Sequence, residues 1–67
     1  MIPEISYIVR FYKDDDPVEE YYYNTEGDAY AHAYLFTEED GYSAIEIARL
    51  DWYMHQETEI ETLVFEG

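Results

Sequence analysis

Cysteine is absent from this chain of 67 residues, and basic residues are scarce, because only Arg10, Lys13 and Arg49 stand against 17 aspartate and glutamate residues. Without cysteine there is no disulfide and no thiolate chemistry. No apolar run approaches the length of a membrane-spanning helix, and residues 1–20 lack the pattern of a signal peptide. The net charge of −14 disfavours nucleic acid and anionic membranes as partners, since both are negatively charged. We therefore expect a soluble, cytoplasmic protein.

Recognisable catalytic and ligand-binding patterns are also missing. Ser6 and Ser43 have no nucleophile elbow around them, and His32 and His55 have no partner at a metal-binding spacing. The segment "DDDPVEE" lacks the alternating acids and central glycine of a calcium loop. Carboxylate catalysis needs one acid with a raised pKa, whereas runs such as "EED" are typical of solvated surface. We expect no enzyme activity, no cofactor and no metal site.

Hydrophobic residues, in contrast, are abundant. They form 48% of the chain and aromatic residues form 19%, which is far too rich for a disordered acidic tail. A chain of this size makes one domain at most and buries only about 60% of its unfolded surface. We expect residues 1–67 to fold as a single acidic domain of marginal stability.

Alternation and turn residues predict the elements of that domain. Residues 5–12 and 18–23 alternate as two strands around an aspartate-rich turn, and 43–54 with 57–65 form a second pair. Thr25 followed by Asp28 resembles a helix capping box, so a helix is expected from there to about Glu39, ended by Gly41. The prediction is an α+β fold: a two-layer ββαββ arrangement with a four-stranded antiparallel sheet and one helix on one face.

The predicted sheet carries large apolar side chains on both faces, although the helix covers only one of them. We expect the helix to cover a set of alternating apolar residues, namely Ile5, Tyr7, Val9, Phe11, Ile45, Ile47, Ile60 and Val64. The opposite face then collects Ile8, Tyr12, Leu50, Trp52, Leu63 and Phe65. Either strand twist and mutual cover by aromatic side chains account for this surplus, or it marks a binding face.

Acidic residues occur in three separate groups along the chain. On an extended strand, residues two apart lie about 6.5 to 7 Å apart on one face, so the acids of the last group should form an evenly stepped row. Neighbouring phosphates on a DNA strand have a spacing of the same order. The candidate partner-binding acids are Asp14, Asp15, Asp16, Glu19 and Glu20; Glu38, Glu39 and Asp40; and Glu57, Glu59 and Glu61.

Small size, one domain, no cysteine, extreme negative charge and many tyrosines resemble, as a class, the small acidic DNA-mimic inhibitors of phages and mobile elements, of the antirestriction or anti-CRISPR type. The resemblance implies a non-enzymatic inhibitor that occupies the basic DNA-binding surface of a host nuclease or defence complex. Counterion release and electrostatic steering would supply affinity and speed. Aromatic neighbours would add specificity, with Tyr12, Tyr22, Trp52 and Phe65 as candidates.

The alternative is a generic acidic protein-interaction module that uses the aromatic sheet face, with a homodimer through that face as one form of it. A DNA mimic should lose its partner steeply as salt rises and should compete with DNA. A module that uses the aromatic face should instead lose binding when Trp52 or Phe65 is truncated.

Overall fold

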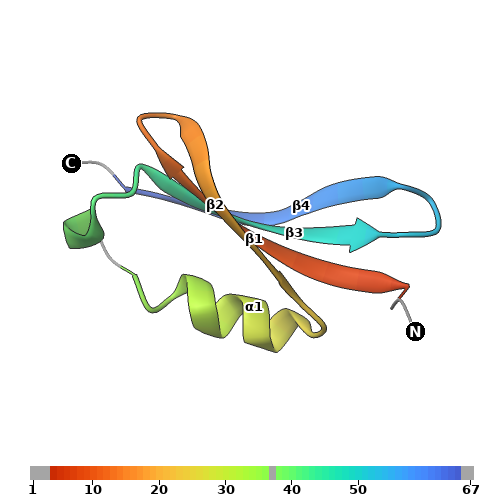
Figure 1. Ribbon diagram of the computed structural model, residues 1–67. Helices are drawn as coiled ribbons and strands as arrows, with labels where there is room; N and C mark the ends of the chain where they lie inside the picture. The colour runs from red at the N-terminus through yellow and green to blue at the C-terminus, as the bar shows by residue number, and fades with distance from the viewer. Residues whose placement is uncertain (1–3, 37, 66–67) are drawn as a thin grey trace.

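Four antiparallel strands and one α-helix form two layers in this protein (Figure 1). The computed structural model describes residues 4–36 and 38–65. The strand order in the sheet is β2-β1-β3-β4, with α1 on one face. The predicted α+β fold is confirmed, with these bounds: β1 (Ile5–Lys13), β2 (Asp16–Tyr23), α1 (Glu26–Ala33), a 3-10 helix η1 (Glu38–Asp40), β3 (Ala44–Asp51) and β4 (Gln56–Val64).

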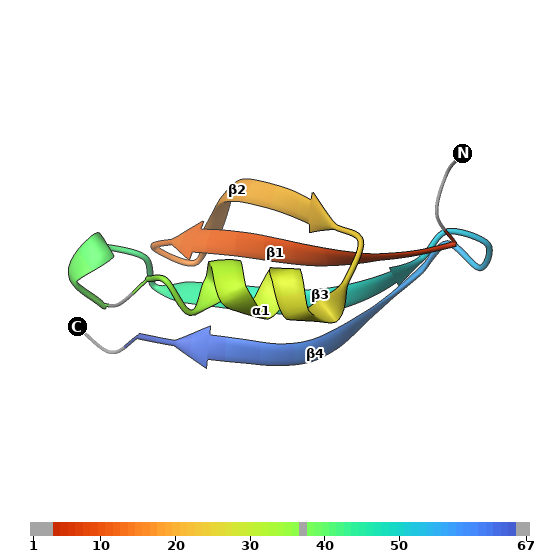
Figure 2. The ribbon, with the colours of Figure 1, turned by 90° about the horizontal axis from the view of Figure 1, so that it is seen from below.

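The alternation of β1 and β3 sorts their side chains as predicted. Val9 lies opposite Ile47 across the β1–β3 pair, and Phe11 lies opposite Ile45. All four are buried in the core with the helix residues Ala29 and Ala33. We call this side of the sheet the helix face and the other side the open face. Figure 2 shows α1 lying along β1 and β3, which are the two central strands.

Helix α1 begins where the capping pattern predicts but ends early. The Thr25 hydroxyl accepts a hydrogen bond from the Asp28 amide at 3.2 Å. The helix ends at Ala33, not near Glu39. A longer helix would place the acidic run 38–40 at the negative end of its dipole, where carboxylates are unfavourable. That run instead forms η1, and Gly41, with φ of 87°, follows η1 and not the α-helix.

Two aspartates form the turn of the β1–β2 hairpin. Asp14 and Asp15 have φ values of 52° and 67°, and Lys13 pairs with Asp16 around them. A two-residue loop with both residues left-handed matches the twist of a hairpin, and aspartate tolerates that conformation better than most residues. Pro17 lies within β2, which starts two residues earlier than predicted. A proline is tolerated there because β2 is an edge strand.

A β-bulge in β4 exchanges the sheet faces that we predicted for the last residues of that strand. Ile47 pairs with Glu61 but the next residue, Ala48, pairs with Glu59, so Ile60 is the extra residue. Because strand side chains alternate, one inserted residue exchanges the faces of everything beyond it. Leu63 and Phe65 therefore pack on the core with Ile60, while Val64 is 68% exposed. The predicted helix-face position of Val64 and the predicted open-face positions of Leu63 and Phe65 are wrong.

Aromatic rings fill one end of the core. Phe11 has its ring centroid 4.9 Å from those of both Phe36 and Tyr42, and 5.3 Å from the ring of His32. His32 also lies 4.9 Å from the Tyr21 ring. Edge-to-face contacts of this kind add to the free energy of burying the rings. Phe36 thus belongs to the core although it lies beyond the helix.

The molecule is elongated, with principal extents of 39 × 20 × 17 Å. The β1–β2 turn and η1 lie at one end of the long axis, and the β3–β4 turn lies at the other (Figures 1 and 2). The two ends therefore present different surfaces to a partner.

Candidate acidic interaction surface

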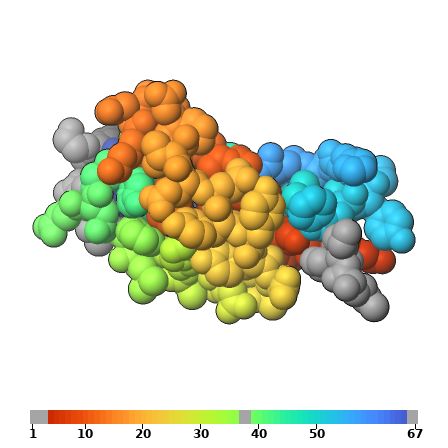
Figure 3. All heavy atoms as spheres, in the orientation of Figure 1, coloured from red at the N-terminus to blue at the C-terminus, as the bar shows by residue number. Residues whose placement is uncertain are grey.

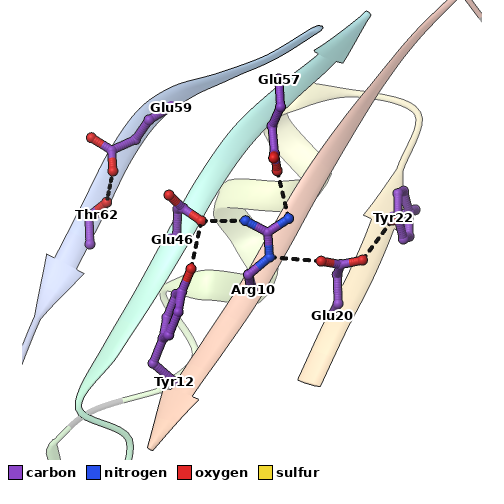
Figure 4. Close-up of polar contacts among 8 residues, drawn as sticks. All are labelled: Arg10, Tyr12, Glu20, Tyr22, Glu46, Glu57, Glu59 and Thr62. Atoms are coloured by element: carbon purple, nitrogen blue, oxygen red, sulfur yellow. Dashed lines mark hydrogen bonds and ion pairs between the residues drawn. The ribbon is translucent and has the colours of Figure 1, made fainter. Parts of the chain in front are cut away.

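Arg10 is the centre of the open face. It lies on β1 and binds one carboxylate from each of the other three strands (Figure 4). Its Nε lies 2.7 Å from Glu20, its Nη1 lies 2.6 Å from Glu46, and its Nη2 lies 2.6 Å from Glu57. These partners come from β2, β3 and β4 respectively. One cation thus holds three acidic side chains in fixed positions on the open face.

Hydroxyl groups hold two of these carboxylates and a fourth one, Glu59. The Tyr12 phenol donates to Glu46 at 3.0 Å and the Tyr22 phenol donates to Glu20 at 2.6 Å. On β4, the Thr62 hydroxyl donates to Glu59 at 2.6 Å. Bonds of hydroxyl groups to charged acceptors are short and strong compared with neutral ones. The result is an array of oriented acids, which we call the carboxylate array: Glu20, Glu46, Glu57 and Glu59.

Hydrogen bonds shift the pKa values of two groups on the open face, Glu20 and Arg10, toward their charged forms. The hydrogen bond from Tyr22, followed by that from Arg10, lowers the pKa of Glu20. Partial burial of Arg10 opposes its charge, but the hydrogen bonds of Glu20 and Glu57 outweigh that cost and raise the pKa of Arg10. The bonds between Glu20 and Arg10 therefore favour the charged form of both groups.

Two of the predicted acids lie on the helix face instead. Glu19 accepts hydrogen bonds from Tyr21 at 2.6 Å and from Tyr42 at 2.5 Å. Glu61 accepts one from Tyr34 on the far side of the β4 bulge. The predicted row of Glu57, Glu59 and Glu61 is therefore wrong, because the bulge leaves the first two on the open face and turns Glu61 to the other.

A second acidic group lies at one end of the molecule. The β1–β2 turn carries Asp14, Asp15 and Asp16, and it lies beside the segment that follows η1, since the Asp15 amide donates to Ser43 Oγ at 3.3 Å. Glu39 and Asp40 are exposed in η1. The green segment that contains η1 lies at the same end of the molecule as the orange β1–β2 turn (Figure 3). The side chain of Glu38 lies outside the described residues. We call Asp14, Asp15, Asp16, Glu39 and Asp40 the acidic end.

The four predicted aromatic contacts have different positions. Tyr22 and Trp52 stack on the open face with ring centroids 6.2 Å apart, and the indole donates to Ser6 at 2.8 Å. Tyr12 is half-buried beside Glu46. Phe65 packs on the core of the helix face, so it does not line the open face.

The Tyr22–Trp52 stack explains how the open face buries apolar residues without a helix. Ile8 and Ala48 are paired neighbours on that face and are 2% and 1% exposed. Tyr22 lies directly opposite Ile8 across the β1–β2 pair, and its ring reaches Trp52. The Tyr22–Trp52 stack thus accompanies a buried Ile8, whereas Leu63 and Phe65 leave the predicted surplus because the bulge turns them to the helix face.

Arg10 and Glu46 were missed as candidate residues. Alternation places Arg10 on the same face as Ile8, and an arginine directly opposite a glutamate on the neighbouring strand is a favourable pair. The scarcity of basic residues was the signal, because a lone arginine in the middle of an acidic sheet needs carboxylate partners. Strand order was required to say which three glutamates it would bind.

Among residues 4–36 and 38–65, no group of three or more histidine, aspartate and glutamate side chains is arranged to hold a metal ion. A shallow hollow of about 250 Å³ lies beside β2 and is lined by Arg10, Pro17, Val18, Glu19 and Glu20. Within the same residues, no helix has the length and apolar character needed to cross a membrane.

Comparisons of this chain with protein-family models, with curated protein sequences and with solved structures found no match. Its function is therefore inferred from the charge and geometry of its own residues.

Proposed function

We propose that this protein is a non-enzymatic acidic binding protein that mimics DNA and occupies the positively charged DNA-binding surface of a host nuclease or defence complex, as an antirestriction or anti-CRISPR inhibitor does. The observation that supports this function is the carboxylate array. Its acids are spread over three strands of one face and are held by Arg10, Tyr12, Tyr22 and Thr62.

The dimensions of a β-sheet suit this role. Neighbouring strands lie about 4.8 Å apart, and side chains two apart on a strand are about 6.5 to 7 Å apart. Glu57 and Glu59 lie two residues apart on β4, both before the bulge, and Glu46 and Glu20 extend the array across the sheet. Spacings of this size are close to those between DNA phosphates, so a row of lysine and arginine side chains could bind the array as it binds a DNA strand.

Fixed acids bind a basic surface better than mobile ones. A glutamate on a disordered chain loses rotamer freedom when it is bound, at a cost of about 0.5–1.5 kcal/mol per side chain. Here the hydroxyl donors and Arg10 have already restricted those rotamers in the folded protein. Arg10 neutralises one charge, so four carboxylates and one guanidinium leave a net charge of −3 on this group.

The acidic end extends the negative surface along the long axis of the molecule. Asp14 and Asp15 are held in a tight turn, and the Asp15 amide is bonded to Ser43. With the carboxylate array on the open face, this end gives a basic groove two regions to contact. Long-range attraction by a net charge of −14 would accelerate the encounter.

One observation favours the second candidate, an acidic protein-interaction module that pairs through its aromatic face. Tyr22 and Trp52 are both partly exposed and lie beside the carboxylate array. A homodimer through this face would bring two copies of the array together, which is electrostatically unfavourable. We therefore place this function second.

The test is binding and competition with a panel of purified DNA-binding enzymes, comprising type I restriction enzymes and RNA-guided CRISPR effector complexes. The variant carries Glu57→Gln and Glu59→Gln, in which the amides can still accept the bonds of Arg10 and Thr62. Its matched control carries Glu4→Gln and Glu26→Gln, which removes the same charge outside the array. We expect the array variant to bind at least tenfold more weakly, with a salt slope smaller by about 2, and the control to bind nearly as well as wild type.

Two results would contradict the proposed function. In one, the two variants bind equally, which would mean that net charge and not the position of the acids determines binding. In the other, saturating DNA fails to displace the protein from its target, which would place the contact outside the DNA-binding surface.

A further inference from the structure

The β3–β4 turn presents three large apolar residues in succession to solvent. Trp52 is 37% exposed, Tyr53 is 77% exposed and Met54 is 68% exposed. Single exposed apolar residues are ordinary, but runs of three or more are a liability unless they serve a function. We call these residues the apolar tip. They lie at the opposite end of the long axis from the acidic end (Figure 2).

The apolar tip is held in a defined conformation. Asp51 Oδ1 accepts hydrogen bonds from the Tyr53 amide at 3.0 Å and from the Met54 amide at 3.1 Å. The Trp52 amide donates to the Glu4 carbonyl at 2.9 Å, and its indole is bonded to Ser6 and stacked on Tyr22. A preorganised aromatic turn loses little entropy on binding, and tryptophan and tyrosine are the residues most often found at the energetic centre of interfaces.

Resting on the proposed function, we propose that the apolar tip is the specificity anchor of the protein, and that it enters an apolar recess at the edge of the basic surface that the carboxylate array contacts. The partner is thus a protein with a cationic groove and an adjoining hydrophobic pocket. DNA has no counterpart of the apolar tip. The tip would therefore distinguish one basic protein from another where charge alone cannot.

The area of the apolar tip and the charge of the surface beside it both favour a basic protein as the partner. Three large side chains offer at most about 150–250 Å² each, which falls below the roughly 800 Å² per partner that a stable interface buries. Contact must therefore continue onto the neighbouring surface. That surface is the open face, because Trp52 stacks on Tyr22 and Tyr22 is bonded to Glu20 of the array. Its negative charge repels a second copy or an anionic membrane and attracts a basic protein.

The test uses Trp52, the single tryptophan of the chain, as a probe. Wild type and three variants are used to capture proteins from a bacterial lysate: Tyr53→Ser with Met54→Ser, the array variant Glu57→Gln with Glu59→Gln, and an apolar control, Leu35→Ser, whose residue is 75% exposed outside the apolar tip. Each captured protein is identified, purified and added to protein labelled with 5-fluorotryptophan. The fluorine resonance then reports the surroundings of Trp52 in the complex.

We expect the tip variant to bind the purified partner at least tenfold more weakly, through faster dissociation and with an unchanged salt slope, while the Leu35 control binds as wild type does. The fluorine resonance should shift on binding. Equal capture and equal affinity for wild type and the tip variant, or a resonance that does not move in the complex, would overturn the proposed anchor and leave the DNA-mimic function standing.

A partner that is lost with the tip variant, yet is insensitive to the array variant and to DNA, would leave the apolar tip as a binding site but overturn both the DNA mimic and the position of the tip beside a cationic groove. Two further outcomes would assign the apolar tip to a different occupant and overturn the proposal. One is a wild-type dimer in sedimentation that becomes monomeric in the tip variant. The other is a fluorine shift with phosphatidylcholine vesicles alone.

Discussion

The two faces of the sheet are built from the same strands but are stabilised in different ways. On the helix face, Val9, Ile45 and Ile47 are buried against α1 by the hydrophobic effect, which depends on area and not on direction. On the open face, Arg10 holds three glutamates by bonds that depend on exact position. The helix face can absorb small changes of side-chain shape. The open face is left with uncompensated charge when one partner of Arg10, or Arg10 itself, is removed.

The largest expected effect is on the helix face. Phe11→Ala removes the ring at the centre of the aromatic group formed with Tyr21, His32, Phe36 and Tyr42. Such changes typically lower the free energy of unfolding by about 3–5 kcal/mol, which is a large fraction of the stability of so small a domain. Urea denaturation followed by circular dichroism measures the loss. Phe11→Leu should lose clearly less, and an equal loss would argue against ring packing as the cause.

The corresponding change on the open face is Arg10→Met. It leaves Glu20, Glu46 and Glu57 without their shared cation, and we expect a loss of about 1–3 kcal/mol, below that of a fully buried ion pair because the glutamates are partly solvated. Urea denaturation at low salt is the measurement. Adding Glu46→Gln to the Arg10→Met variant should recover part of the loss. An Arg10→Met variant as stable as wild type would show that the three ion pairs contribute nothing net.

The β4 bulge is tested by neighbouring residues that it sends to opposite faces. Leu63 packs on the core and Val64 is exposed on the open face. Leu63→Ala should cost about 1–2 kcal/mol because the side chain is only partly buried, whereas Val64→Ala should stay within about 0.5 kcal/mol. The reverse order of the two losses would show that β4 runs without the bulge.

The pH dependence of stability comes from the tyrosine–glutamate pairs. The hydrogen bond to Glu19, followed by burial, raises the pKa of Tyr42 to about 12. A pKa raised in the folded state means that this contribution is complete below the ordinary tyrosine value of about 10 and is lost as the pH rises through 12. The bonds from Tyr21 and Tyr42 lower the pKa of Glu19, so its contribution is present above the ordinary glutamate value and is lost as the pH falls through the lowered one.

Tyr42→Phe is the variant for this prediction. The slope of stability against pH above pH 10 should become shallower, as measured by denaturation at a series of pH values, and the ultraviolet titration of tyrosinate should lose its latest step. A variant that keeps the latest step and loses absorbance change at lower pH would contradict the raised pKa of Tyr42.

The smallest expected effect concerns the molecule as a whole. Self-repulsion of a net charge of −14 opposes the compact state, so the melting temperature should rise by a few degrees between very low salt and about 0.15 M salt. Arg10→Met should show a larger rise than wild type, because it adds unbalanced charge to the open face. A melting temperature independent of salt would indicate that the hydroxyl donors already compensate the carboxylates locally.

The sequence by itself determined the elements and most of their faces. Alternation in residues 5–12 was enough to separate Val9 and Phe11 from Ile8 and Arg10, because a strand side chain has only two directions to take. Thr25 was enough to place the start of α1, since a cap acts within one turn of chain. These properties are local, and they were predicted from neighbouring residues alone.

Only the tertiary structure decided the order of the strands, the bulge at Ile60 and the partners of Arg10. Each depends on residues that meet across the sheet, such as Glu20, Glu46 and Glu57, which lie 10, 36 and 47 positions from Arg10 along the chain. A single inserted residue turned Glu61 and Phe65 to the helix face without any change in the local pattern of the strand. Contacts between distant segments have no signature in short windows of sequence, because their geometry exists only once the strands are paired.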